Sequence, residues 1–431
     1  MSKVPFSLSS PTKDAHTDLA HAAGTSSYRS WLAGAILITA LLSCLVPAIG
    51  SMQRFAFDHR QRRISPVATI PERTAQLDAM LAGSSMTPGR AQSARLNLTS
   101  INPADVELAV GRLQLRHNPG LSLLLHAAAL YGLEMKVPEH PDPAGATLKQ
   151  VLLDSDSASQ YFQGNPLFVE STWGVRNRTQ TFSRRQWETE RQAHAGQLLC
   201  ELAKHGVPLR EQITIHSQSF DVKDLLRDTM ANFNLKESEI EWNFIALMLY
   251  LPPQRSWIDK FGTHYSFDDL AEELLVRKAQ PEAQPCFGIH RLEGLALLLQ
   301  LDHAHHLLSP ASRNGVVAYL AQEVKLLIAT QSEDGSWPET WYLQEASGTD
   351  GASARHRTIN IHRRVHVTGH HVDWLLLLPS DLIPHATVFE NAGQFLLKAI
   401  LSAEDEDLLK HYCPYSHAAH SLRLLSSNDR R

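Results

Sequence analysis

Cysteine is scarce in this chain of 431 residues, and basic residues are not in excess. The four cysteines are Cys44, Cys200, Cys286 and Cys413. Their wide spacing argues against a disulfide framework as the basis of the fold. The 40 Lys and Arg residues against 45 Asp and Glu give a net charge of −5, so we expect no nucleic acid as partner.

Charged residues are absent from Trp31 to Ile49, and a helix of this length spans about 28 Å, enough to cross the hydrocarbon core of a bilayer. We expect residues 31–50 to form a single transmembrane helix after a polar segment over residues 1–30, which makes the membrane a partner. Cleavage of a signal peptide before Ser51 and lipidation of Cys44 are the alternatives. Basic residues after the run favour a cytoplasmic large domain, whereas export would place it on the other side.

After a linker that we expect over residues 51–94, apolar residues follow helical periodicity toward the C-terminus. Strongly apolar helices, such as Ile240–Leu251, alternate with amphipathic ones, such as Phe267–Arg277. A ring of helical hairpins has this alternation, because its inner helices are buried all round and its outer helices face solvent on one side. The pattern predicts an all-α fold, an α/α toroid over residues 95–431, with a small β-hairpin inserted between Leu167 and Arg178.

Four histidines mark a repeat, because each stands at the start of an apolar run: His194, His290, His371 and His417. The interval from 371 to 417 is close to half of that from 194 to 290. A unit of roughly 46 to 48 residues fits one helical hairpin with its two turns. In a closed ring these histidines would gather at one mouth of the central cavity.

The heptad Gln331–Trp337, QSEDGSW, is similar to the Q-x-x-x-G-x-W repeat of triterpene cyclases, in which the Trp and Gln tie an outer helix to the following turn. Together with the helical-pair spacing across Trp187–Leu425, it resembles the terpenoid cyclase and protein prenyltransferase-like α/α-toroid superfamily, as a bacterial member. The resemblance implies lyase, transferase or cyclase chemistry. It also predicts that Trp337 is buried against the helix Val316–Ile328.

Cys286 and His290 form the candidate centre of the site, since residues four apart share one helix face. One interpretation is a zinc site with Cys286 and His290 as ligands. Its third ligand is His370 or, in the version we favour, His371, with one position open as in catalytic zinc sites. Protein prenyltransferases bind zinc through an Asp-x-Cys pair and a later His, and here Gln284 occupies the Asp position. The other interpretation is a Cys286 thiolate nucleophile activated by His290.

Tyr415 and His417 are the candidate catalytic groups for proton transfer to or from a ligand. The sequence thus predicts an enzyme of lyase, transferase or cyclase type, with an apolar or carbohydrate-like ligand that is a small molecule or a glycan. A noncatalytic scaffold or envelope-binding protein is the alternative. An enzyme should bring four side chains close together, whereas a scaffold would leave them scattered: Cys286, His290, His371 and His417.

Overall fold

The computed structural model describes residues 68–426, apart from residues 97, 99, 117–118, 142–144, 163–165, 179–193, 238, 278–284 and 343–359. The described part is mostly helical, which confirms the all-α class. The expected anchor over residues 31–50 and the polar segment over residues 1–30 lie outside the described residues. Within the described part, no helix is long and apolar enough to cross a membrane.

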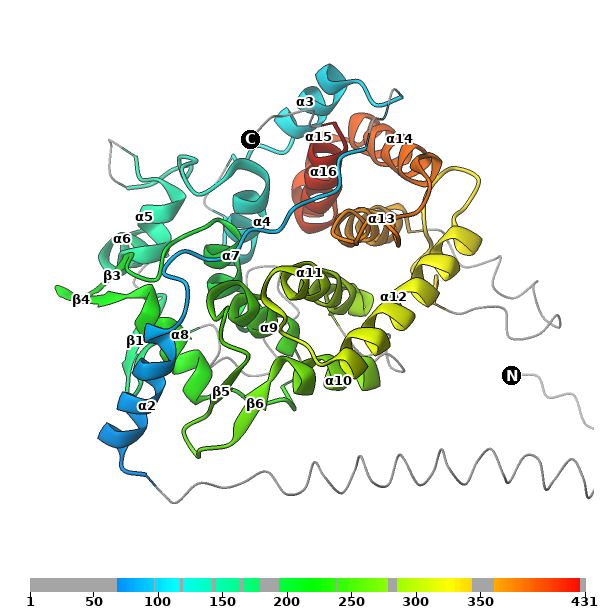
Figure 1. Ribbon diagram of the computed structural model, residues 1–431. Coiled ribbons are helices and arrows are strands. Elements are labelled where there is room, and N and C mark those ends of the chain that lie inside the picture. The colour runs from blue at the N-terminus through cyan, green and yellow to red at the C-terminus, as the bar shows by residue number, and fades with distance from the viewer. Residues whose placement is uncertain are drawn as a thin grey trace, which may run out of the picture. The chain divides into compact units, whose positions relative to one another are not determined.

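The helices and strands are labelled in Figure 1 where space allows. The α-helices are α2 (Ile70–Ala82), α3 (Pro103–Gly111), α4 (Leu121–Tyr131), α5 (Leu148–Leu153), α6 (Ser155–Tyr161), α7 (Gln197–Lys204), α8 (Val222–Ala231), α9 (Ile240–Tyr250), α10 (Phe267–Arg277), α11 (Ile289–His305), α12 (Pro310–Thr330), α13 (Ile361–Leu375), α14 (Ala386–Ser402), α15 (Asp405–Lys410) and α16 (Tyr412–Ser426). A short 3-10 helix, η5 (Pro285–Gly288), precedes α11. The strands are β1 (Phe168–Ser171), β2 (Gly174–Asn177), β3 (Gln212–Ile215), β4 (Gln218–Asp221), β5 (Ser256–Ile258) and β6 (His264–Ser266).

Six helices of the described part contact one another in cyclic order: α4, α7, α9, α11, α13 and α16, with α16 packing in turn against α4. Figure 1 shows them side by side in this order. Helix α9 is buried along its whole length, because every residue from Ile240 to Tyr250 lies in the core. Helices α10 and α12 pack on the outside of α11, and α14 packs on α13 and α16. The expected alternation of buried and half-exposed helices is therefore present.

Local sequence signals set the ends of these helices. Ser309 caps α12, its hydroxyl accepting a hydrogen bond from the backbone N of Ser312, and Pro310 occupies the first helical position. Ser266 plays the corresponding part at α10, its hydroxyl accepting from the backbone N of Asp269 at 3.2 Å, and the Asp269 carboxylate in turn accepts from the backbone N of Ser266 at 2.8 Å. The acidic start of α10 is thus a helix cap.

The stretch expected to be a linker joins the folded domain from Ile70 onward. Helix α2 packs against α8 and buries Leu77 and Leu81 in the core. Further along, the backbone N of Gly89 donates to the carbonyl of Leu249 at 2.8 Å. Residues 70–94 are therefore held by the domain through both apolar burial and backbone hydrogen bonds, rather than spanning free space between two parts.

In the part of the chain that the structure describes, three two-stranded antiparallel hairpins interrupt the helices. The first pairs β1 with β2, with Phe168 opposite Asn177 and Ser171 opposite Gly174, which confirms the predicted hairpin. The other two, β3 with β4 and β5 with β6, were not predicted from the sequence.

The heptad Gln331–Trp337 ties α12 to its neighbours. The indole of Trp337 is fully buried and donates to the carbonyl of Leu327 at 2.8 Å, which confirms its predicted burial against α12. The Gln331 amide donates to the carbonyl of Val388, at the start of α14, at 2.9 Å. Gly335, with φ 89°, lies so close to α14 that a Cβ atom would clash with the backbone of Asn391. The heptad therefore fixes the connection between an outer helix and the elements that follow.

Candidate metal centre

The four marked histidines occupy different places on their helices. His194 precedes α7. His290 is the second residue of α11, a helix that begins directly after Gly288, whose left-handed backbone (φ 71°) caps it. His371 and His417 lie in the interior of α13 and α16. The expectation that all four open a helix is therefore wrong for these two.

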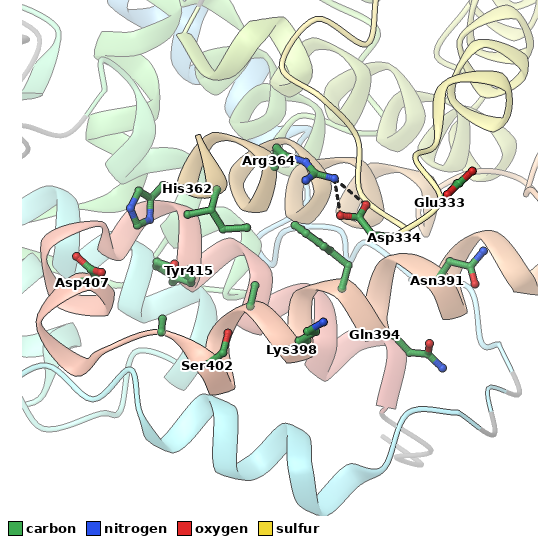
Figure 2. Close-up of a pocket in the computed structure, with 14 residues that line it drawn as sticks. Glu333, Asp334, His362, Arg364, Asn391, Gln394, Lys398, Ser402, Asp407 and Tyr415 are labelled. Atoms are coloured by element: carbon green, nitrogen blue, oxygen red, sulfur yellow. Dashed lines mark hydrogen bonds and ion pairs between the residues drawn. The ribbon is translucent and has the colours of Figure 1, made fainter. Parts of the chain in front are cut away.

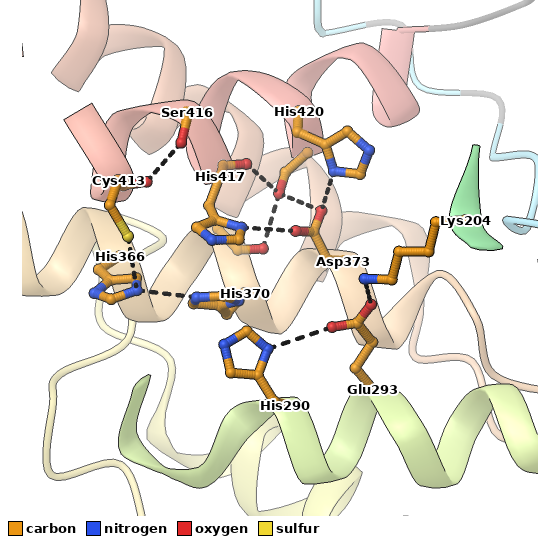
Figure 3. Close-up of polar contacts among 12 residues, drawn as sticks. Lys204, His290, Glu293, His366, His370, Asp373, Cys413, Ser416, His417 and His420 are labelled. Carbon is orange, nitrogen blue, oxygen red and sulfur yellow. Dashed lines mark hydrogen bonds and ion pairs between the residues drawn. The ribbon is translucent and has the colours of Figure 1, made fainter. Parts of the chain in front are cut away.

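His370 lies at the centre of a cluster of imidazoles between α11, α13 and α16 (Figure 3). Its ring centroid is 3.8 Å from that of His417 and 4.7 Å from those of His290 and His366. His366 and His370 are one turn apart on α13, and their Nε2 atoms face each other at 2.9 Å. Two nitrogens at this distance must share a proton or an ion, because two bare lone pairs would repel each other.

Two further imidazoles extend this cluster, those of His126 and His194. The His126 ring on α4 lies 5.2 Å from that of His417, and the His194 ring lies 6.4 Å from that of His290. His194 also stacks on Trp242 at 5.5 Å. Of the four marked histidines, His194, His290 and His417 are thus grouped.

His371 points to the other side of α13. Its ring packs at 4.5 Å against Trp341 and at 5.4 Å against Trp337, and the indole of Trp374 donates to its Nδ1 at 3.0 Å. Successive residues of an α-helix point about 100° apart, so His370 and His371 cannot both face the cluster. This corrects the expected place of His371: its neighbour His370 lies in the cluster instead.

Cys286 reaches the cluster from η5, not from α11. Its backbone is in the left-handed region (φ 48°), so it does not share a helical face with His290 as expected. Its sulfur instead lies close to one ring nitrogen each of His366 and His370, and these three candidate ligand atoms all lie within 4.8 Å of one another. Cys413 approaches from the first turn of α16, with its sulfur 3.9 Å from the Nε2 of His366.

Carboxylates that are only partly exposed lie next to several of these imidazoles. The Glu293 carboxylate lies 3.5 Å from the Nδ1 of His290 and also pairs with Lys204 at 2.5 Å. Asp373 lies 3.6 Å from the Nδ1 of His417 and 3.1 Å from the Nδ1 of His420 (Figure 3). Glu293 thus faces the ring of His290, and Asp373 faces those of both His417 and His420, an arrangement common behind metal ligands and catalytic histidines.

Burial dominates the electrostatics of the cluster. It lowers the pKa of His126 to about 3 and holds the pKa values of His366 and His370 well below their usual range. These rings are therefore neutral, the form that donates a lone pair to a metal. Burial also raises the pKa of the Cys286 thiol well above its usual value, with the neighbouring Cys413 adding to the effect. Burial thus disfavours the Cys286 thiolate unless a metal ion or a neighbouring group stabilises it.

Tyr415 lies on α16 but faces a different part of the protein. Its ring is 5.7 Å from that of His362, and both line a cavity of about 600 Å³ together with Asp407, Lys398 and Phe395 (Figure 2). Burial raises the pKa of its phenol. The structure therefore separates Tyr415 from the Cys and His cluster with which it was grouped.

Comparisons with family models, with curated proteins and with solved structures give no match to this chain. The candidate ligands that the sequence pattern missed are His126, His366 and Cys413. His366 had a readable signal, because His362, His366 and His370 recur every four residues on one face of α13. His126 had none, since it is an isolated histidine within the apolar run of α4.

Proposed function

We propose that this chain is an α/α-toroid enzyme that binds a zinc-like metal ion and acts on its ligand by metal-assisted proton transfer, as lyases and transferases do. The cyclic contacts of six helices and the heptad around Trp337 support the toroid and its relation to the cyclase and prenyltransferase-like superfamily. Anchoring through residues 31–50 and a small-molecule or glycan ligand are part of this proposal.

The observation that carries the proposal is the convergence of Cys286, His366 and His370. Two imidazole nitrogens 2.9 Å apart, with a thiol sulfur within 4.8 Å of both, form a donor set that zinc prefers over magnesium or calcium. Three protein ligands leave a fourth position for a ligand or water, as in catalytic zinc sites. A bound ion of this kind polarises oxygen atoms and acidifies water.

The groups around this donor set are suited to proton transfer. His290 is 5% exposed, and its Nδ1 lies 3.5 Å from the carboxylate of Glu293, while neither ring nitrogen makes a hydrogen bond among the described residues. His417 is oriented by Asp373 in the same manner. A histidine backed by a carboxylate holds a proton on Nδ1 and exchanges one at Nε2, so both are candidates for general acid or base.

Metal content tests the proposal. The full-length chain, purified without chelator, should contain zinc or a similar transition metal, and Cys286→Ser should lose it while retaining its helical circular dichroism. The matched control is Cys200→Ser, since Cys200 is a fully buried cysteine on α7 outside the three donors. A metal-free chain that takes up no zinc on titration would contradict the proposal.

A noncatalytic protein is the second candidate, favoured by the burial of His370, which is 2% exposed. In that case the metal would only hold η5 and α13 together, with every coordination position closed. Cobalt substitution separates the two functions. The visible spectrum of the cobalt protein should change on addition of azide if one position is open, and should stay unchanged if the site is purely structural.

A further inference from the structure

A second set of three donors lies next to the first. The candidate ligand atoms of His126, Cys413 and His417 all lie within 4.8 Å of one another. Two of them come from α16 and one from α4, whereas the first set comes from η5 and α13. The two sets share no residue, and each contains one thiol and two imidazoles.

The hydrogen bonds of the second set direct its nitrogens inward. The Nδ1 of His126 lies 2.7 Å from the carbonyl of Ser122, which only accepts, so Nδ1 carries the proton and Nε2 keeps its lone pair. The Nδ1 of His417 faces the carboxylate of Asp373 at 3.6 Å, so the proton of this ring is also expected on Nδ1 and the lone pair on Nε2. Metal-binding histidines are held by such contacts to a carbonyl and a carboxylate.

The two sets are adjacent but do not merge into one. The sulfur of Cys413 lies 3.9 Å from the Nε2 of His366, and the rings of His417 and His370 are 3.8 Å apart. Among the described residues, Cys413 groups with His126 and His417 and not with the first set, while His370, Asp373 and His417 form a further group that links the two sets. A single tetrahedral ion would need its four donors around one point, and six donors arranged as two triads fit two ions instead.

Charge balance also suits two ions. Two divalent cations in a buried site need nearby negative charge. Two thiolates would supply part of it, and the carboxylates of Asp373, Glu293 and Glu239 lie against the imidazoles of His417, His290 and His194, respectively. Lys204 pairs with Glu293 and His420 pairs with Asp373, so part of this negative charge is already offset within the protein.

We propose that His126, Cys413 and His417 bind a second transition-metal ion beside the ion of Cys286, His366 and His370, so that the cluster is a two-metal centre. Ions in such centres lie about 3.5 to 4 Å apart and bind a ligand between them. This inference rests on the proposed function and extends it. A ligand with an oxygen that bridges two metals, such as a phosphate, a carboxylate or a vicinal diol, is the class that fits.

Zinc stoichiometry tests the inference. The full-length chain, stripped with chelator and titrated with zinc, should bind two ions, and His126→Gln and Cys413→Ser should each bind one. Cys286→Ser should also bind one, held by the second set. His303→Gln, at the exposed end of α11, is the matched control and should still bind two. Circular dichroism and the melting temperature of each variant confirm that it is folded.

The outcomes separate this inference from the proposed function. One ion per chain, lost in Cys286→Ser and retained in His126→Gln, would overturn the second site and leave the proposed function standing. One ion lost in all three variants would mean a single shared site and would also overturn the inference. No bound zinc would overturn both. Two ions, with exchange coupling in the electron paramagnetic resonance spectrum of the cobalt protein, would support the two-metal centre.

Discussion

His371 is expected to make the protein sensitive to acid. It is fully buried, and its Nδ1 accepts a hydrogen bond from the indole of Trp374, so protonation of Nδ1 would set two N–H groups against each other. Burial accordingly holds its pKa well below the usual range. In the unfolded chain His371 takes up a proton near pH 6.5, whereas in the folded chain it stays neutral. Its contribution to the free energy of unfolding is therefore present above this pH and is lost as the pH falls. Between pH 7.5 and 5.5 the loss from this one residue is about 1.4 kcal/mol.

The variant His371→Asn isolates this contribution, because the Asn oxygen can still accept from Trp374 but does not titrate. Urea unfolding in the presence of chelator, followed by tryptophan fluorescence, should show a variant that is less stable at pH 7.5 because of the cavity. Between pH 7.5 and 5.5 it should then lose about 1.4 kcal/mol less than the wild type. His303→Asn, at an exposed position, should follow the wild type. Parallel stability curves for wild type and His371→Asn would refute the reasoning.

Two further predictions concern the packing around the six helices that contact one another in cyclic order. Trp337→Ala should lower the free energy of unfolding by about 3 to 5 kcal/mol through cavity formation, whereas Trp337→Phe should cost about 1 to 2 kcal/mol by leaving the Leu327 carbonyl without its donor. Arg112 donates to the carbonyls at the C-terminal end of α14 and pairs with Asp405 at 2.7 Å, so Arg112→Met should cost about 1 to 3 kcal/mol in thermal unfolding. Arg116→Met is the control, since Arg116 also pairs with Asp405 but is 53% exposed, so its loss should change stability little.

Elements with a strong local signal could be predicted from the sequence. The amphipathic helix Phe267–Arg277 is found with the predicted bounds, and the apolar run Ile240–Leu251 ends one residue earlier as α9. The hairpin of β1 and β2 was visible because turn residues separate two short β-rich runs. In each case, a few consecutive residues contain all the information that sets the element.

The composition of the site was predictable, but the side that each residue faces was not. Periodicity marked the region of His370 and His371, yet the choice between them depends on how α13 is rotated against α11 and α16, which tertiary packing decides. Cys286 was placed on α11 from spacing alone, although Gly288 begins that helix only after the cysteine. Residues 70–94 looked like a linker because Ser, Thr and Gly dominate part of them, and only Leu77 and Leu81 revealed their packing.

The close approach of α13 and α16 connects the packing of the ring to the metal centre. A Cβ atom on Gly369 would lie 2.9 Å from the backbone N of Ala418 and 3.0 Å from the carbonyl carbon of His417, and backbone atoms cannot move aside cheaply. Gly369→Ala should therefore push the two helices apart and cost about 1 to 3 kcal/mol of stability. It should also weaken zinc binding, because His370 and His417 lie on the two helices that would separate.

Gly315→Ala is the matched control for this substitution. It also lies inside a helix, α12, but its Cβ would meet only the Leu275 side chain at an ordinary 3.5 Å, so the higher helix propensity of Ala should leave stability equal or raise it by up to about 1 kcal/mol. Melting temperature and zinc affinity measured on the two variants together distinguish a general effect of adding a methyl group from one specific to the contact of α13 with α16. If Gly369→Ala kept both stability and zinc affinity, the spacing of these helices would not be what holds the histidines in place.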